Sequence, residues 1–141
     1  MSAYSVHFDP DEMDELIKRS PFNLKKDLKE ISKESIQSIS EEIANELLKG
    51  INRPPTTVVR YLAKLKNAAW VKIKTIDVKR DVGKSNGYRC VLLVDTFNKH
   101  AFLLHLYRHG HGEDEDIDRK SENKLKRLVD EYSEALSENQ N

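Results

Sequence analysis

The sequence predicts one α+β domain with a small, antiparallel-rich sheet, in the order strand, two helices, three consecutive strands and C-terminal helix. Three observations lead to this fold class. The chain has 141 residues, which suits a single domain. Apolar residues recur at steps of three and four in residues 9–51 and 118–137, the period of an amphipathic helix. In residues 69–108 they alternate or form short runs between turns, which is typical of strands.

The first strand is expected over residues 3–8, where apolar and polar side chains alternate. Asp9 and Pro10 then predict the start of a helix, since Asp is a favoured N-cap and proline fits the first helical position. Ser20-Pro21 interrupts this helix, and a longer one follows as far as Gly50. A step of five residues in its apolar stripe indicates a break near Ser35.

Residues 56–66 are ambiguous between a strand and a short helical turn. Residues 70–76, 87–94 and 100–108 predict three strands joined by hairpins, so they should pair antiparallel. The position of the first strand in this sheet is left open. We expect the helices to cover one face of the sheet and to leave the other face free for function. The last helix is expected over residues 118–137.

Nothing in the sequence indicates a membrane or secreted protein. No stretch approaches the roughly 20 apolar residues of a membrane span, and the N-terminal residues do not resemble a secretory signal. The one cysteine, Cys90, lies in an apolar run and is expected to be a small buried side chain. A cytoplasmic location without membrane partners is therefore the expectation.

The charge of the chain is segregated, although the net charge is zero. Residues 53–108 carry 12 Lys/Arg and 3 acidic residues. Residues 1–52 carry 7 Lys/Arg and 11 acidic residues, and residues 109–141 carry 5 Lys/Arg and 10 acidic residues. A basic middle between acidic ends fits a surface that binds a polyanion. The alternative is ordinary: helix surfaces are often acidic, and lysines at sheet edges oppose aggregation.

The cations of the basic segment are placed where they could converge. Lys72 and Lys74 are two residues apart in one strand and therefore point the same way. Arg89 is the one charge in the next strand, and Arg108 ends the last strand. His109 and His111 follow directly, before an acidic block at residues 113–116.

Such a set suits metal-free cleavage of RNA. The 2′-hydroxyl must lose a proton, the phosphorane must be stabilised by positive charge, and the leaving 5′-oxygen must gain a proton. Arg and Lys match phosphate oxygens, and histidine transfers protons near neutral pH. We expect no cofactor and no metal, because a structural zinc site wants four ligands and no second ligand cluster accompanies His109 and His111. A plain turn is the other interpretation of those histidines.

Several segments together resemble the RelE/ParE superfamily, the toxins of bacterial type II toxin–antitoxin pairs. AYSVHFDPDEMDEL is similar to the family's first strand and helix entry. LAKLKNAAWVKIK and SNGYRCVLLVD resemble its basic strand and its Gly-Tyr-Arg strand that ends in Asp. LLHLYRHG resembles the closing strand. The likeness covers most of residues 3–112, and is patchy in the helices.

The resemblance implies a RelE/ParE-like fold and a ribosome-dependent messenger RNA endonuclease. Lys72 and Lys74 match the family's paired lysines, which implies phosphate binding and help with proton transfer. Arg89 matches the arginine that stabilises the transition state, and Arg108 or His109 stands in the place of the last arginine. The implied partners are the ribosomal A site, messenger RNA and a cognate antitoxin that brings acidic groups to the basic face. Further RNA-binding residues are expected in the basic segment: Lys66, Lys79, Arg80 and Lys84.

The chain departs from the family pattern after its last arginine, where many members have a tyrosine. His109 or His111 could replace it, as histidines do in HigB-like relatives. The departure leaves two alternatives open: a ParE-like inhibitor of DNA gyrase, and a RelE-fold protein that only binds a partner.

Structural interpretations compete with each functional one. Arg89 could pair with Asp95 or Asp81, and Lys72 and Lys74 could simply face solvent. For His105 a hydrogen-bonded structural role is favoured. Trp70 and Tyr88 are expected to pack in the sheet.

Overall fold

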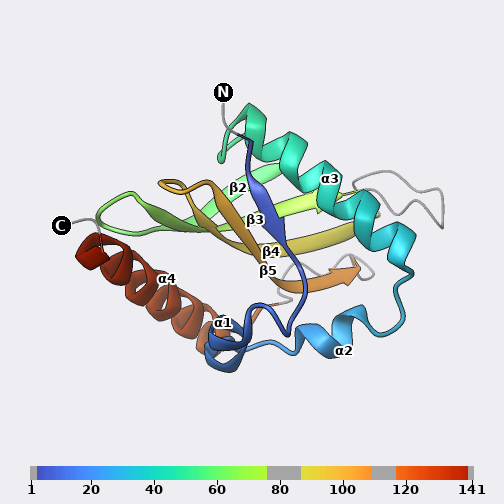
Figure 1. The fold of residues 1–141 in the computed structure, drawn as a ribbon, viewed down its shortest axis with the longest axis horizontal. Helices are drawn as coiled ribbons and strands as arrows, with labels where there is room; N and C mark the ends of the chain where they lie inside the picture. Colours follow the sequence, from blue (N-terminus) through green and yellow to red (C-terminus); the bar gives the residue numbers. More distant parts are fainter. Residues whose placement is uncertain (1–2, 76–86, 109–116, 140–141) are drawn as a thin grey trace.

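The computed structural model describes residues 3–75, 87–108 and 117–139, and it shows an α+β fold with one mixed sheet (Figure 1). Four helices are described, of which none is long and apolar enough to cross a membrane in this part of the chain. The elements in chain order are β1 (Ser5–His7), α1 (Asp14–Arg19), α2 (Leu24–Leu28), α3 (Lys33–Lys49), β2 (Thr57–Leu62), β3 (Ala68–Thr75), β4 (Tyr88–Asp95), β5 (His100–Arg108) and α4 (Arg119–Asn139).

The sheet has the order β1-β5-β4-β3-β2. β2 to β5 pair antiparallel with their sequence neighbours, as hairpin connections dictate. β1 joins at the free edge of β5 and runs parallel to it. The ambiguous segment is thus the strand β2, and the prediction of three consecutive strands was one short. A register shift between Val59 and Tyr61 interrupts the pairing of β2 with β3 and is one reason why this segment lacks a regular strand pattern.

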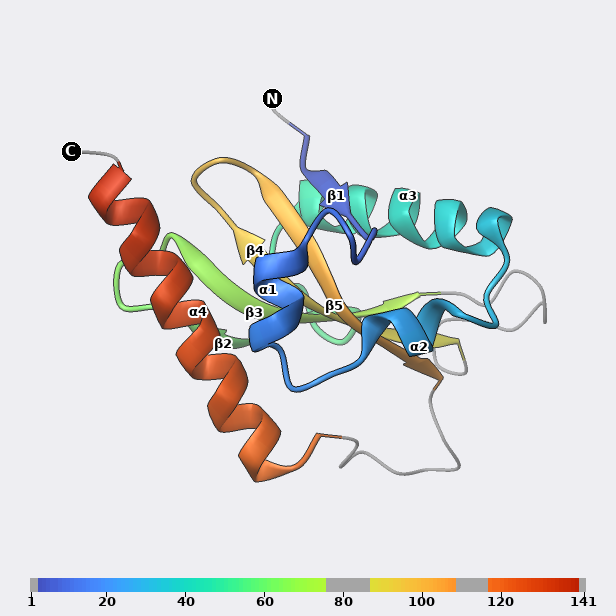
Figure 2. The same ribbon diagram turned by 60° about the horizontal axis from the view of Figure 1, so that its bottom comes forward.

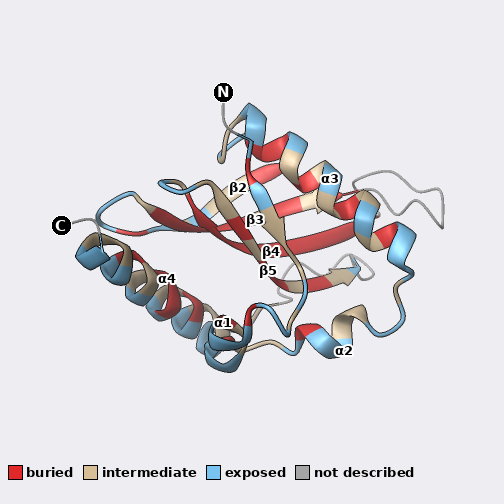
Figure 3. Ribbon diagram, in the orientation of Figure 1, coloured by how far each residue is buried: buried red, intermediate tan, exposed pale blue. Residues whose placement is uncertain are grey.

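Both faces of the sheet are covered by helices, so the expectation of one free face was wrong (Figure 3). α3 packs through Ile39, Ile43 and Leu47 on one face, which we call the α3 face. α4 packs through Leu125 and Leu128, among others, on the opposite face, which we call the α4 face. The central strand β4 is buried along its whole length and has an almost continuous apolar sequence, as expected for a strand covered on both sides.

The N-terminal helical region contains three helices and not the two predicted. The first helix begins only at Asp14, because residues 9–13 form a turn in which the N–H groups of Glu12 and Met13 bond to the carbonyl groups three residues back, those of Asp9 and Pro10. The predicted long helix is divided between α2 and α3, and the division lies before Ser35 at residues 29–32. Ser32 starts α3 by accepting from the Ser35 N–H at 3.1 Å.

The last helix agrees closely with the prediction. Asp118 caps it by accepting from the Ser121 N–H at 2.7 Å, and these hydrogen bonds lower the pKa of the Asp118 carboxyl. Figure 2 shows α1 beside α4, and Arg19 joins the two through Glu131 at 3.3 Å. The helix pair packs on the part of the α4 face around Trp70 and Leu93.

The expected burial of three central side chains is confirmed. Trp70 and Tyr88 are 2% and 4% exposed and pack in the sheet. Cys90 is fully buried, and this burial raises the pKa of its thiol to about 12. These side chains are therefore structural, as the sequence predicted.

Candidate functional site

The strand register brings three of the predicted cations together on the α4 face. Lys74 lies directly opposite Arg89 across the β3–β4 pair, and Lys72 lies opposite Val91. Alternation then places all three cations on the same side of the sheet as Trp70. The predicted convergence of Lys72, Lys74 and Arg89 is thus confirmed.

Tyr107 completes this cluster, although no pattern in the sequence marked it as a site residue. It lies directly opposite Arg89 across the β4–β5 pair. The ammonium group of Lys72 stands 5.7 Å from the centroid of the Tyr107 ring, within cation–π range. We call Lys72, Lys74, Arg89 and Tyr107 the cation cluster. Arg89 is only 5% exposed, whereas the other three side chains are partly exposed.

Arg108 does not belong to the cation cluster. It lies opposite Tyr88 on the α3 face, where its guanidinium donates a hydrogen bond of 3.0 Å to the Tyr88 hydroxyl and lies 5.1 Å from that ring. The cause is a bulge in β5: Val91 pairs with His105 and Leu92 with Leu103, so one extra residue lies between them.

The bulge reverses the alternation of side chains beyond it. Without the extra residue, Arg108 would share the α4 face with Phe102, because even-numbered positions would stay on one side. With it, the odd-numbered His105 and Tyr107 reach the α4 face and Arg108 is turned away. A bulge has no clear signature in the run of apolar residues around Leu104, so the sequence alone did not reveal this exchange.

The remaining predicted site residues are distant or lie outside the described part. Lys66 is in the β2–β3 turn, at the end of the sheet where Ala68 pairs with Asp95, opposite to the end that carries Lys74 and Arg89. Asp95 belongs to that same distant end, so it is no partner for Arg89. Lys79, Arg80, Lys84, His109, His111 and Asp81 lie outside the described residues.

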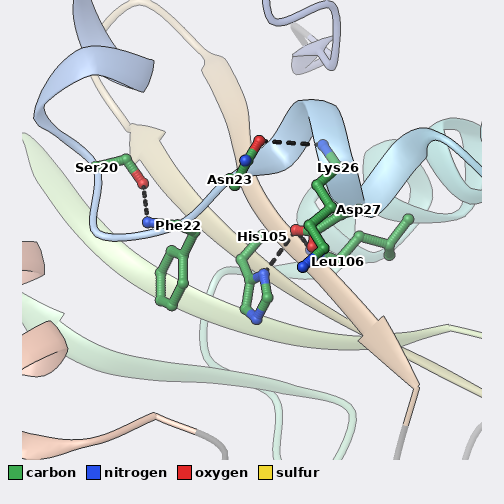
Figure 4. Close-up of polar contacts among 7 residues, drawn as sticks. All are labelled: Ser20, Phe22, Asn23, Lys26, Asp27, His105 and Leu106. Atoms are coloured by element: carbon green, nitrogen blue, oxygen red, sulfur yellow. Dashed lines mark hydrogen bonds and ion pairs between the residues drawn. The ribbon is translucent and has the colours of Figure 1, made fainter.

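His105 stands at the border of the cation cluster and is hydrogen-bonded, as expected. Its Nδ1 lies 2.7 Å from Oδ2 of Asp27 in α2 (Figure 4). Its ring stacks on Phe22 at 4.2 Å between centroids and on Tyr107 at 4.8 Å. Asp27 also accepts from the Leu106 N–H at 3.1 Å, which satisfies an edge of β5 that the short β1 does not reach.

The arrangement offers positive charge, a phenol and an imidazole within one patch. Two lysines and an arginine can bind a phosphodiester and stabilise charge that develops on it. Within residues 3–75, 87–108 and 117–139, no group of three or more His, Cys, Asp or Glu side chains is arranged to hold a metal ion. The side chains of the patch can bind an anion and transfer protons.

Comparison of the chain with family models, with curated proteins and with solved structures finds no match.

Proposed function

We propose that the protein is a metal-free RNA endonuclease that acts in the cytoplasm as the toxin of a type II toxin–antitoxin pair and cuts messenger RNA on the ribosome. The observation that carries the proposal is the alignment of Lys74, Arg89 and Tyr107 across three neighbouring strands, with Lys72 against the Tyr107 ring. The likeness of the strand sequences to RelE-type toxins supports the same function.

The geometry of the cation cluster suits a phosphodiester better than a protein surface. Three cations stand on rigid central strands, so their positions are set before a ligand binds, and preorganised charge is what stabilises a phosphorane. An antitoxin would oppose the cluster with acidic side chains. The Tyr107 phenol also supplies a tyrosine close to the cations, although it precedes Arg108 in the sequence and does not follow it.

The test is primer-extension mapping of a messenger RNA incubated with the purified protein and programmed ribosomes. We expect discrete cuts at A-site codons. The double variant Lys72→Ala/Lys74→Ala should cut at least about 100-fold more slowly, because removal of one preorganised donor already costs a factor of that order. Arg89→Lys keeps the charge at this buried position and should still be slow, since an ammonium group cannot replace the guanidinium fork.

A matched control is Lys64→Ala, which removes an exposed lysine from the β2–β3 turn at the distant end of the sheet. It should cut at the wild-type rate. Intact RNA with the wild-type protein would refute the nuclease, and inhibition of gyrase supercoiling would then be measured. Cuts that survive in the lysine double variant would keep the function and refute the assignment of the cluster.

A further inference from the structure

Asp27 and His105 form a carboxylate–imidazole pair beside the cation cluster. The two residues are 78 positions apart in the chain, and α2 and β5 bring Nδ1 of His105 to 2.7 Å from Oδ2 of Asp27. The side chains are 18% and 17% exposed, so the pair is shielded and still reaches solvent. Figure 4 shows the imidazole edge opposite Nδ1 turned away from Asp27 and α2.

The hydrogen bonds determine which ring nitrogen carries the proton. Oδ2 of Asp27 accepts from the Leu106 N–H as well as from His105, and an ionised carboxylate can only accept. Nδ1 of His105 must therefore donate. In a neutral ring this leaves the lone pair on Nε2, which is the nitrogen free to take up a proton.

The orientation of the ring is set on both sides. Phe22 stacks on it with an interplanar angle of 3° at 4.2 Å, and Tyr107 stacks with an angle of 28° at 4.8 Å. Within the described residues, Nε2 has no hydrogen-bond partner. Because Tyr107 also contacts Lys72 and faces Arg89, the imidazole is separated from the cations by a single side chain.

A purely structural role, in which the pair holds α2 against β5, explains only part of the His105–Asp27 arrangement. Asp27 already fastens α2 to β5 through the Leu106 N–H, and an apolar side chain at position 105 would fill the space between Phe22 and Tyr107. What the histidine adds is an oriented base at the border of an anion-binding patch. A carboxylate that holds Nδ1–H is the arrangement that activates histidine as a general base.

We propose that His105 is the general base of the nuclease and that Asp27 is its positioning residue, which makes RNA with a free 2′-hydroxyl the required substrate class. This inference rests on the proposed function. Nε2 takes the proton of the 2′-hydroxyl as O2′ forms its bond to phosphorus, and the P–O5′ bond breaks. Lys72 gives a proton to the departing 5′-oxygen. The products are a 2′,3′-cyclic phosphate and a 5′-hydroxyl, and water restores both protonation states.

The first test reads the tautomer in the free protein, without RNA, by nitrogen-15 NMR of the histidine rings. We expect His105 to carry its proton on Nδ1. Asp27→Ala removes the oxygen that accepts from Nδ1, so the ring should lose its preference for the Nδ1–H form and the share of the Nε2–H form should rise. A wild-type ring protonated on Nε2, or an unchanged tautomer in Asp27→Ala, would overturn the proposal.

The second test measures single-turnover cleavage of messenger RNA on programmed ribosomes. Asp27→Ala and His105→Ala should each slow cleavage by about 10² to 10⁴, the usual range for general-base catalysis. Added imidazole should restore part of the His105→Ala rate but none of the Asp27→Ala rate. An RNA with one 2′-deoxy nucleotide at the cut site should stay intact with the wild-type protein.

The matched control is His100→Ala, which removes another histidine of β5 that bonds His7 at 3.0 Å, away from the cluster. It should cleave at the wild-type rate. If the wild-type protein cuts RNA and the Asp27 and His105 variants cut within threefold of it, the general base is refuted and the nuclease stands. If the wild-type protein cuts no RNA, the proposed function itself is refuted, and the catalytic role of His105 with it.

Discussion

The side chain of Asp95 should be among the most important for stability in the chain. It is fully buried at the end of β4, where its carboxylate accepts four hydrogen bonds. Oδ1 accepts from the backbone N–H groups of Phe97 and Asn98 at 2.9 and 2.7 Å. Oδ2 accepts from the Asn98 amide at 3.2 Å and from the Tyr132 hydroxyl at 2.8 Å. One carboxylate thus joins the β4–β5 turn to α4.

The magnitude for Asp95→Ala follows from these contacts. Hydrogen bonds to a charged acceptor contribute about 1.5 to 3 kcal/mol each, so four would be worth roughly 6 to 12 kcal/mol. Removal of a buried charge returns several kcal/mol of desolvation, and water can reach part of the turn. We expect a net loss of about 4 kcal/mol in the free energy of unfolding. Asp95→Asn keeps one acceptor oxygen and should lose about 1 to 2 kcal/mol.

Urea unfolding at pH 7, followed by circular dichroism, measures these losses. The slope of the free energy against urea should stay unchanged, and the melting temperature of Asp95→Ala should fall by roughly 10 °C. Asp14→Ala is the control, because Asp14 is 62% exposed and forms only a surface pair with Lys18. A loss below 1 kcal/mol for Asp95→Ala would refute the view that the carboxylate joins turn and helix.

Three further predictions concern titratable groups. Burial and the hydrogen bond to Asp95 raise the pKa of Tyr132. The stability that the neutral Tyr132 hydroxyl gives the fold is therefore fully present below pH about 10 and is lost as the pH rises further. The free energy of unfolding of Tyr132→Phe should therefore fall less than that of the wild-type protein as the pH rises above about 10. An equal fall in both proteins would contradict this. Burial, and then the charge of His100, lower the pKa of His7. Stability linked to His7 is thus present above pH about 6.5 and lost below it, and denaturation curves of His7→Phe should depend less on pH between 7 and 5. Burial raises the pKa of Cys90 to about 12. A thiol reagent should therefore react with Cys90 at least about 100-fold faster after unfolding in urea than in the native protein. Rapid labelling of the native protein would contradict the burial.

The fold class followed from the sequence because the two periodicities are local properties. Alternation identified β1 and β3, and steps of three and four identified α3 and α4. The errors arose where neighbouring segments interact. The division of α2 from α3 lies a few residues before the break predicted near Ser35. The late start of α1 depends on a turn that the sequence did not reveal, in which the Glu12 N–H bonds to the Asp9 carbonyl.

The candidate site was predictable in part for the same reason. Lys72 and Lys74 point the same way because side chains alternate within one strand, and this needs no tertiary information. Their meeting with Arg89 followed from a hairpin, which is the simplest connection between neighbouring strands. The relative positions of Lys72, Lys74 and Arg89 could therefore be predicted from alternation within a strand and from the pairing of neighbouring strands.

What the sequence by itself determined is therefore the fold class, most of its elements, the basic middle of the chain and the common side of Lys72 and Lys74. Only the tertiary structure decided that helices cover both faces, that Tyr107 and not Arg108 joins the cation cluster, and that Asp27 meets His105. The physical reason is that a bulge of one residue reverses every later side chain in β5, and that a contact across 78 residues exists only once α2 has packed against that strand.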